Sequence, residues 1–266
     1  WSNPLLMAPT VADKYNLQPM YDYVAPLLRA VDPLRALFFE GVTWDWFGVG
    51  FSHAPGGDAH ANRSVLSYHF YMPPDFNLDI QMAARAKDMA RLKVGGFLTE
   101  FGVHVCSGCG TIIAEQVMSK CDSMFQSWTF WQLKPFPGNK TGSGGFSPLY
   151  FDNGTVIPAM AFNLSRTYAQ AIAGTGESMS FDIATGAFSL SYSINSEVTK
   201  PETVVYASQR YHYPNGMQVT IQPAHLVASG ALSWNVSATD ANIFTLSHDP
   251  ALVPVGTTVT LSITAL

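Results

Sequence analysis

The chain has 266 residues, of which 47% are hydrophobic and 12% charged, and its formal net charge is -5 at pH 7. That composition suits one large or two modest globular domains, and its scattered Lys and Arg residues offer no basic surface for nucleic acid. No apolar run approaches the ~20 residues that a membrane helix needs, and no basic segment leads into a hydrophobic one at the start. The sequence as given therefore predicts a soluble chain without a signal peptide.

The first two thirds of the chain alternate between helical and strand-like patterns, judged from hydrophobic spacing and from Gly and Pro boundaries. In chain order we expect a helix over 17–30, strands over 34–42 and 65–72, a helix over 76–93, a strand over 95–103, a helix over 111–121, a strand over 125–133, a loop over 135–157 and a helix over 159–174. This order predicts parallel strands joined by right-handed crossovers, as in an α/β barrel or a doubly wound sheet. Four strands make half of an eight-stranded barrel.

After Gly174 the apolar period changes to the alternation of β-strands. The strand-like runs lie over 179–183, 188–194, 203–207, 217–221, 231–236, 243–246 and 257–263. No helical pattern interrupts them, so they predict an all-β sandwich. The expected organisation is α/β over 1–174, corresponding to the C-terminal half of a (β/α)8 TIM barrel, followed by a β-sandwich domain over 175–266.

A carboxylate stands out in the segment GGFLTEFG, because Glu100 lies where the expected strand ends. The carboxyl ends of barrel strands carry the catalytic groups. His69 and Tyr71 lie two residues apart at the end of an earlier strand, so their side chains share one face while Tyr68 and Phe70 share the other. A phenol or imidazole beside a carboxylate can hold it ionised and aimed as a nucleophile. The alternatives are a capping or salt-bridged Glu100 and a purely packing role for His69 and Tyr71.

Tryptophan residues follow two of the expected strands. Trp128 and Trp131 lie on opposite faces of their strand, and Trp131 is the one that we expect at the barrel mouth, since a loop begins just after it. An indole there can stack on a sugar ring, although a buried structural tryptophan is the alternative. Trp44 and Trp46 follow the first strand, so we expect them at the same barrel mouth as Trp131. This aromatic surface implies a ligand with an apolar part.

Five Asn-x-Ser/Thr sequons point to the secretory pathway. Their asparagines are Asn62, Asn139, Asn153, Asn163 and Asn235. Because so many sequons are unusual in a chain of this size, we expect a secreted or lysosomal glycoprotein.

The three cysteines, Cys106, Cys109 and Cys121, lie close together in the sequence. They permit one disulfide in a loop and leave one thiol over. A zinc site that also uses His104 could be drawn, but a single CxxC without a second pair is weak support for it, so the disulfide is favoured. No metal and no cofactor are predicted.

Several segments together resemble a known enzyme family. LTEFG around Glu100 resembles the nucleophile motif of family 5 glycoside hydrolases, and YHFY resembles the His-x-Tyr pair one strand earlier in that family. FFEGVTWDWFGVGFSHAPGG, RSVLSYHFY, FWQLK and RTYAQAIAG, in this order, resemble the endoglycoceramidases and their close relatives. The resemblance extends over essentially the whole chain.

The resemblance implies a retaining hydrolysis, in which Glu100 attacks the anomeric carbon while a second carboxyl about 5 Å away protonates the leaving oxygen. Carried over residue by residue, His69 and Tyr71 position the nucleophile and the sugar, and Trp131 stacks under the ring. Lys134 is a further carry-over at the substrate, and Glu40 is another with no role assigned.

One element of the family pattern is missing. The acid/base glutamate of family 5 lies in an Asn-Glu-Pro motif on the fourth strand, and this sequence contains no such motif. The opening WSNPLLMAPTVADKYNLQP resembles the segment just downstream of that motif in the family. The chain thus resembles the C-terminal portion of a longer enzyme, and we expect it to be inactive and poorly soluble without the N-terminal half of the barrel.

The leading hypothesis is hydrolysis of the β-glycosidic bond between oligosaccharide and ceramide in glycosphingolipids, with peripheral contact to the membrane. A β-glucosidase acting on glucosylceramide or a steryl glucoside is an alternative that would share these motifs. A non-catalytic glycan- or lipid-binding protein is the third interpretation.

Overall fold

A computed structural model describes residues 4–42, 48–72, 75, 77–102, 110–134 and 148–266. The chain forms two compact units. The first comprises Trp1–Cys106, Gln126–Leu133 and Asn139–Ser147, and the second Ser107–Phe125, Lys134–Gly138 and Pro148–Leu266. In the described part of the chain, no helix has the length and apolar character needed to cross a bilayer.

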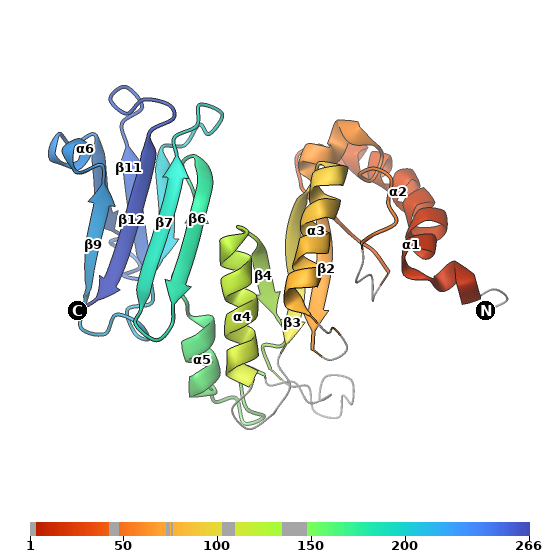
Figure 1. Cartoon of the computed structure of the whole chain (residues 1–266), viewed down its shortest axis with the longest axis horizontal. Helices are drawn as coiled ribbons and strands as arrows, with labels where there is room; N and C mark the ends of the chain where they lie inside the picture. The colour runs from red at the N-terminus through yellow and green to blue at the C-terminus, as the bar shows by residue number, and fades with distance from the viewer. Residues whose placement is uncertain (1–3, 43–47, 73–74, 76, 103–109, 135–147) are drawn as a thin grey trace. The chain divides into compact units, whose positions relative to one another are not determined.

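The first unit contains the predicted parallel sheet, with its strands in the order β1-β2-β3-β4. The strands are β1 (Leu37–Glu40), β2 (Ser64–Tyr71), β3 (Gly95–Gly102) and β4 (Ser127–Phe130), and the two predicted helices are α2 (Gln18–Val31) and α3 (Leu78–Leu92). Figure 1 shows α3 beside strands β2 and β3. Short helical segments that the sequence pattern did not predict are η1 (Pro4–Met7), α1 (Pro9–Ala12), η2 (Asp13–Leu17) and η3 (Asp58–Arg63).

One face of this parallel sheet is buried and the other is partly open. Leu66, Tyr68 and Phe70 of β2 are at most 2% exposed. On β1, Phe39 is buried and packs edge-on against Phe51, whereas its neighbour Phe38 is 51% exposed. Because alternate residues of a strand point to opposite faces, β2 places His69 and Tyr71 on the face opposite the packed one, as predicted.

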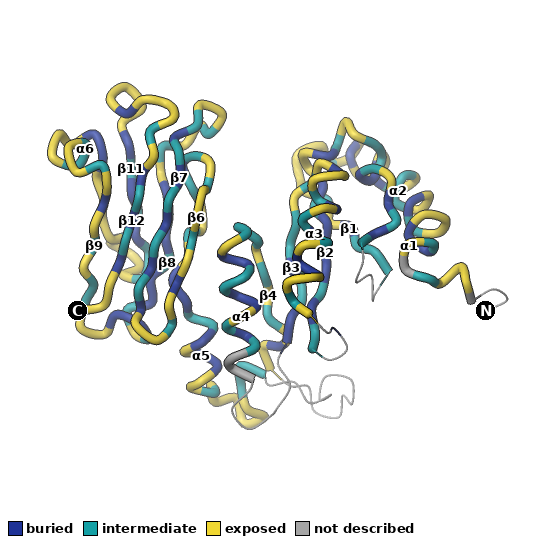
Figure 2. Tube along the Cα trace, in the orientation of Figure 1, coloured by how far each residue is buried: buried dark blue, intermediate teal, exposed yellow. Residues whose placement is uncertain are grey.

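The second unit contains a β-sandwich of two four-stranded antiparallel sheets, in the orders β10-β11-β8-β5 and β6-β7-β12-β9. The strands are β5 (Tyr168–Ala171), β6 (Thr175–Asp182), β7 (Ala187–Ser193), β8 (Glu202–Tyr206), β9 (Met217–Gln222), β10 (Leu232–Val236), β11 (Ile243–His248) and β12 (Thr258–Ala265). Buried and less buried residues alternate along β7 and β11 (Figure 2). The helices of this unit are α4 (Gly110–Ser123), α5 (Pro158–Leu164) and α6 (Ala224–Ala228). The fold class is therefore the predicted one, a portion of an α/β barrel followed by a β-sandwich.

Two predictions within the second unit are wrong. The helix expected over 159–174 ends at Leu164, and Tyr168–Ala171 form strand β5, which pairs with β8. Between them Arg166 and Thr167 are fully buried, so their tertiary contacts override the helical preference of the alanine-rich segment. The sandwich is also not free of helix, since α6 occupies the connection between β9 and β10. The domain boundary at 174/175 stays a prediction.

A buried ion pair ties α4 to the segment that precedes β5. Arg166 Nε and Nη2 donate to Asp122 Oδ2 at 3.0 and 2.5 Å, and the two side chains are 0% and 3% exposed. The guanidinium also lies 5.3 Å from the ring centroid of Phe181. Burial raises the pKa of Asp122 to about 6, although the charge and hydrogen bonds of Arg166 oppose the shift.

Candidate active site

The three residues predicted to form the reaction centre converge at the ends of β2 and β3. The Tyr71 hydroxyl donates to Glu100 Oε2 at 2.7 Å, and His69 Nδ1 lies 3.6 Å from the same oxygen. The register between β2 and β3 shifts after Tyr68, where Thr99 of β3 is the extra residue, and this shift places His69 directly opposite Glu100. The β-bulge therefore brings the imidazole and the carboxylate side by side.

Both contacts of the Glu100 carboxylate fall on one oxygen. Among the described residues, Tyr71 and His69 both contact Oε2, and the Glu100 side chain is 33% exposed. Burial raises the pKa of Tyr71 well above its ordinary value, and the hydrogen bond and charge of Glu100 raise it further. The phenol is thus a permanent donor near neutral pH, able to fix the carboxylate without taking its charge.

A second carboxylate lies on the far side of the imidazole. His69 Nε2 is 3.4 Å from Glu40 Oε1, at the end of β1. Ser67 Oγ donates to Glu40 Oε2 at 3.3 Å. The structure therefore assembles Glu40, His69 and Glu100 across three adjacent strands, in a row that the sequence pattern did not anticipate.

Buried polar side chains anchor the backbone of these residues. Gln81 Nε2, on α3, donates to the carbonyl of His69 at 2.9 Å. The Asp75 carboxylate accepts from the amide of Tyr71 at 2.6 Å. Gln81 and Asp75 are 5% and 8% exposed. Sequence reasoning missed both; a polar residue on the buried stripe of α3 is the one signal that could have indicated Gln81.

The tryptophans at the end of β4 have different environments. Trp128 packs edge-on against Phe101, with ring centroids 5.5 Å apart. Trp131 follows the strand, its amide donates to the carbonyl of Phe101 at 2.8 Å, and its side chain is 38% exposed. The peptide bond between Trp131 and Gln132 is cis. Because the indole of Trp131 is partly exposed beyond the end of β4, its flat face is accessible for stacking against a sugar ring.

The remaining predicted binding residues have no established place beside Glu100. Lys134 is exposed and belongs to the second unit. Trp44 and Trp46 lie outside the described residues. Their roles at the substrate stay predictions.

The sequon asparagines differ in accessibility. Asn62, Asn153 and Asn235 are exposed. Asn163 is 8% exposed, and its side-chain amide donates to the carbonyl of Ala159 at 3.1 Å. That burial disfavours a glycan on Asn163, and Asn139 lies outside the described residues.

Of the cysteine cluster, the structure describes one member. Cys121 on α4 is buried, and burial raises the pKa of its thiol to about 12. His104, Cys106 and Cys109 lie outside the described residues, so the disulfide stays a prediction. Within the described residues, no group of three or more His, Cys, Asp or Glu side chains is arranged to hold a metal ion.

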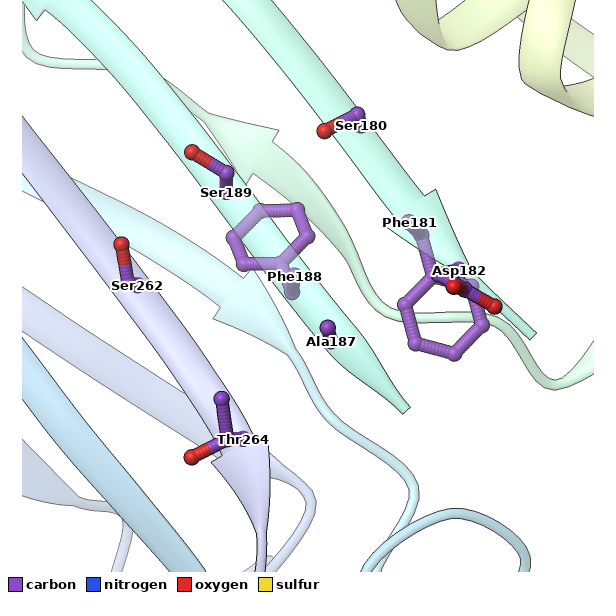
Figure 3. A pocket seen from close by; sticks show the side chains of 8 residues that line it. All are labelled: Ser180, Phe181, Asp182, Ala187, Phe188, Ser189, Ser262 and Thr264. Atoms are coloured by element: carbon purple, nitrogen blue, oxygen red, sulfur yellow. The ribbon is translucent and has the colours of Figure 1, made fainter. Parts of the chain in front are cut away.

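A surface hollow of about 400 Å³ lies on the β6-β7-β12 part of the sandwich (Figure 3). It is lined by Ser180, Phe181, Asp182, Ala187, Phe188, Ser189, Ser262 and Thr264. Its one carboxylate, Asp182, accepts from the amides of Ala184 and Thr185 and so stabilises the adjacent turn. The hollow therefore offers no carboxylate pair for glycoside chemistry.

Comparison with known proteins agrees with this geometry. The profile of cellulase (glycosyl hydrolase family 5) matches residues 4–137, and that of the glycoside hydrolase family 5 C-terminal domain matches residues 166–263. Endo-glycoceramidase II from Rhodococcus sp. in its lactosyl-enzyme form has a similar fold, with a TM-score of 0.75 at 18% identity, over 97% of this chain and 56% of that one. Sterylglucosidase 1 from Cryptococcus neoformans gives 0.58 at 12% identity, over 76% of this chain and 38% of that one.

Relatives with higher identity carry the name endoglycoceramidase. The protein from Cyanea nozakii is 39% identical over all of this chain and 51% of its own length. The protein from Hydra vulgaris is 41% identical over 84% of this chain and 42% of its own length. The chain thus spans about half the length of the curated relatives it matches. On the strength of the family profile, the chain belongs to glycosyl hydrolase family 5.

Proposed function

We propose that the whole protein is a retaining glycoside hydrolase that cleaves the β-glycosidic bond between oligosaccharide and ceramide in glycosphingolipids. The observation that carries this proposal is the convergence of Tyr71 and His69 on one oxygen of Glu100 in a family 5 chain. The identity of 39–41% to two endoglycoceramidases supports the substrate class.

In the proposed reaction, Glu100 Oε1 attacks the anomeric carbon and forms a glycosyl ester. The bond to the ceramide oxygen breaks as that oxygen takes a proton from a second carboxyl about 5 Å from the nucleophile. The same carboxyl then removes a proton from water, which attacks the anomeric carbon and releases Glu100. Tyr71 and His69 hold the nucleophile in position through both steps.

The second carboxyl belongs, in this proposal, to a further segment of the whole protein. The sequence contains no Asn-Glu-Pro motif, and the match covers about half of each relative. The open face of the parallel sheet, where Phe38 is 51% exposed, suits an interior that four more barrel strands enclose. The site needs no metal or cofactor for this chemistry.

For the substrate, we propose that Trp131 stacks on the sugar beside the scissile bond and that Lys134 contacts a polar group of the ligand. Trp44 and Trp46 would meet the ceramide, which brings the enzyme into peripheral contact with the membrane that holds the glycolipid. A ganglioside GM3 complex is known for the Rhodococcus enzyme, a protein of similar fold.

Mass spectrometry of the products that the whole protein releases from a multi-sugar glycosphingolipid tests the proposal. Intact oligosaccharide plus ceramide is the expected result. Release of glucose alone, and only from one-sugar lipids, would favour the β-glucosidase, for which the fold similarity to a sterylglucosidase is the supporting observation. Binding of the glycolipid without any product would instead favour the non-catalytic glycan- or lipid-binding protein.

We further propose that the protein passes through the secretory pathway to a secreted or lysosomal location. Exposed sequons at Asn62, Asn153 and Asn235 support this proposal. Peptide mapping before and after enzymatic deglycosylation of the protein expressed in animal cells tests it, with glycans expected at these three asparagines. Unmodified peptides at all three would contradict it.

A further inference from the structure

His69 has a carboxylate on each side of its ring. Its Nδ1 lies 3.6 Å from Glu100 Oε2, and its Nε2 lies 3.4 Å from Glu40 Oε1. A carboxylate only accepts hydrogen bonds, whereas a neutral imidazole has one donor nitrogen and one acceptor nitrogen. Both contacts are favourable at once only when both ring nitrogens carry protons.

Glu40 is itself held at its backbone and at its side chain. The Tyr21 hydroxyl donates to the Glu40 carbonyl at 3.1 Å and accepts from the Glu40 amide at 3.2 Å. Ser67 donates to Glu40 Oε2 and lies 2.6 Å, Oγ to Oγ1, from Thr99. The Ser67 hydroxyl thus directs a donor at the negative charge of Glu40.

We infer that Glu40 is a positioning residue, which keeps the Nε2 proton on His69 and so directs Nδ1–H at the nucleophile. This inference rests on the proposed function of Glu100. Its chemical consequence concerns charge: when Glu100 becomes an ester it loses its negative charge, and Glu40 then remains as the counter-ion of the protonated His69. Glu40 thereby stabilises the covalent intermediate without touching the sugar.

The test uses Glu40→Gln in the whole protein, because glutamine keeps the size of the side chain while removing its charge. Rates are measured on an aryl β-lactoside, whose good leaving group makes formation of the glycosyl-enzyme less dependent on the acid and on lipid binding. We expect kcat/KM to fall by ~10-fold or more. Glu197→Gln, on an exposed loop of the sandwich, is the matched control and is expected to match wild type.

A double-mutant cycle separates positioning through His69 from a general structural effect. In a His69→Asn background, adding Glu40→Gln is expected to change kcat/KM by less than about 2-fold, because the residue through which Glu40 acts is gone. An equal loss in both backgrounds, or a Glu40→Gln enzyme within about 2-fold of wild type, would overturn the inference.

A second readout is independent of turnover. In the protein with 15N-labelled histidine, the His69 signals, assigned by their loss in His69→Asn, are expected to show two protonated nitrogens in wild type and a change at Nε2 in Glu40→Gln. Unchanged signals would also overturn the inference. If the enzyme cleaves the aryl glycoside but not the glycosphingolipid, the proposed substrate class is wrong. The rates on the aryl glycoside still test the role of Glu40.

Discussion

The hydroxyl of Tyr71 donates a 2.7 Å hydrogen bond to Oε2 of Glu100, from the end of one strand to the end of the next. Burial and the neighbouring carboxylate keep the pKa of this phenol well above its ordinary value, so the proton stays on tyrosine. The bond is therefore charge-assisted and points in one direction, from donor to nucleophile. Replacing Glu100 or Tyr71 should therefore lower the rate of the reaction, for different reasons.

Replacing Glu100 with Gln is expected to lower kcat of the whole protein by roughly 10³-fold or more, because the amide cannot form the glycosyl ester. The melting temperature should stay close to that of wild type, since the side chain is 33% exposed and isosteric with its replacement. Steady-state kinetics and thermal unfolding measure the two effects. Activity retained at the wild-type level would rule out Glu100 as the nucleophile.

Replacing Tyr71 with Phe removes one donor while leaving the ring in place. We expect kcat to fall by roughly 10²-fold, the size of effect seen when one preorganised donor is lost, with a smaller change in KM. Steady-state kinetics on the same glycoside separate the two parameters. A loss confined to KM would show that Tyr71 binds substrate and does not orient Glu100.

The same phenol gives a spectroscopic prediction. In a pH titration followed by tyrosinate absorbance, Tyr71 should stay silent through pH 10, where ordinary tyrosines ionise, because its pKa is raised. The difference between wild type and Tyr71→Phe should thus show no ionising group below that pH. A titrating group near pH 10 in the difference curve would contradict the assigned environment.

The buried ion pair of the second unit should matter for stability. Replacing Asp122 with Ala leaves the fully buried Arg166 without its partner, and we expect a loss of about 3–5 kcal/mol in the free energy of unfolding. Denaturant titration measures it. Replacing both residues together, by Leu and Met, should cost much less, because no uncompensated charge remains; an equal cost would point to packing and not to charge.

Asp122 also predicts a pH dependence. Its pKa is raised from 3.8 to about 6 in the folded protein. Between these two pH values, the folded state therefore holds a proton that the unfolded chain has released. The stability from this group is present below pH 3.8 and is lost as pH rises through about 6. The free energy of unfolding of wild type relative to Asp122→Asn should therefore decrease between these limits and level off above them; a flat difference would contradict the shift.

Gly50 is predicted to be irreplaceable for steric reasons. A Cβ at this position would lie 1.9 Å from the carbonyl oxygen of Thr10, and the Gly50 amide is already held by Asp13 at 2.8 Å. We expect Gly50→Ala to destabilise the fold by about 3 kcal/mol or more. Gly95→Ala is the control, since its nearest neighbour is Val65 Cγ2 at 4.0 Å; equal thermal stability of the two variants would refute the clash.

The parallel strands and the sandwich could be predicted because their apolar periods are strong. The pairing of His69 with Tyr71 on one face followed from alternation alone. The β-bulge that aligns His69 with Glu100 was not predicted; its extra residue lies in β3, where the buried Leu98 and Phe101 are three residues apart and so break the alternation. The helix predicted over 159–174 failed where buried Arg166 meets Asp122, a contact made 44 residues away in sequence.

The contact between Glu40 and His69 did not follow from the family resemblance. The family resemblance gave this residue no role, whereas the structure places its carboxylate against Nε2 of His69 and fixes its backbone through Tyr21. Gln81 and Asp75 were likewise missed, because each contacts only a backbone group of a β2 residue, and the polar side chain of Gln81 on the buried stripe of α3 is the one signal in the sequence. Such long-range polar contacts depend on the finished fold and not on local pattern.

In the proposed mechanism, Glu100 becomes covalently bonded to the sugar. The most direct measurement is mass spectrometry of peptides from the whole protein after reaction with a 2-deoxy-2-fluoro-β-lactoside bearing a good leaving group, which slows hydrolysis of the intermediate. We expect the added sugar on the peptide that contains Glu100, and none in Glu100→Gln. A label on another carboxylate, or an active enzyme that is never labelled, would contradict it.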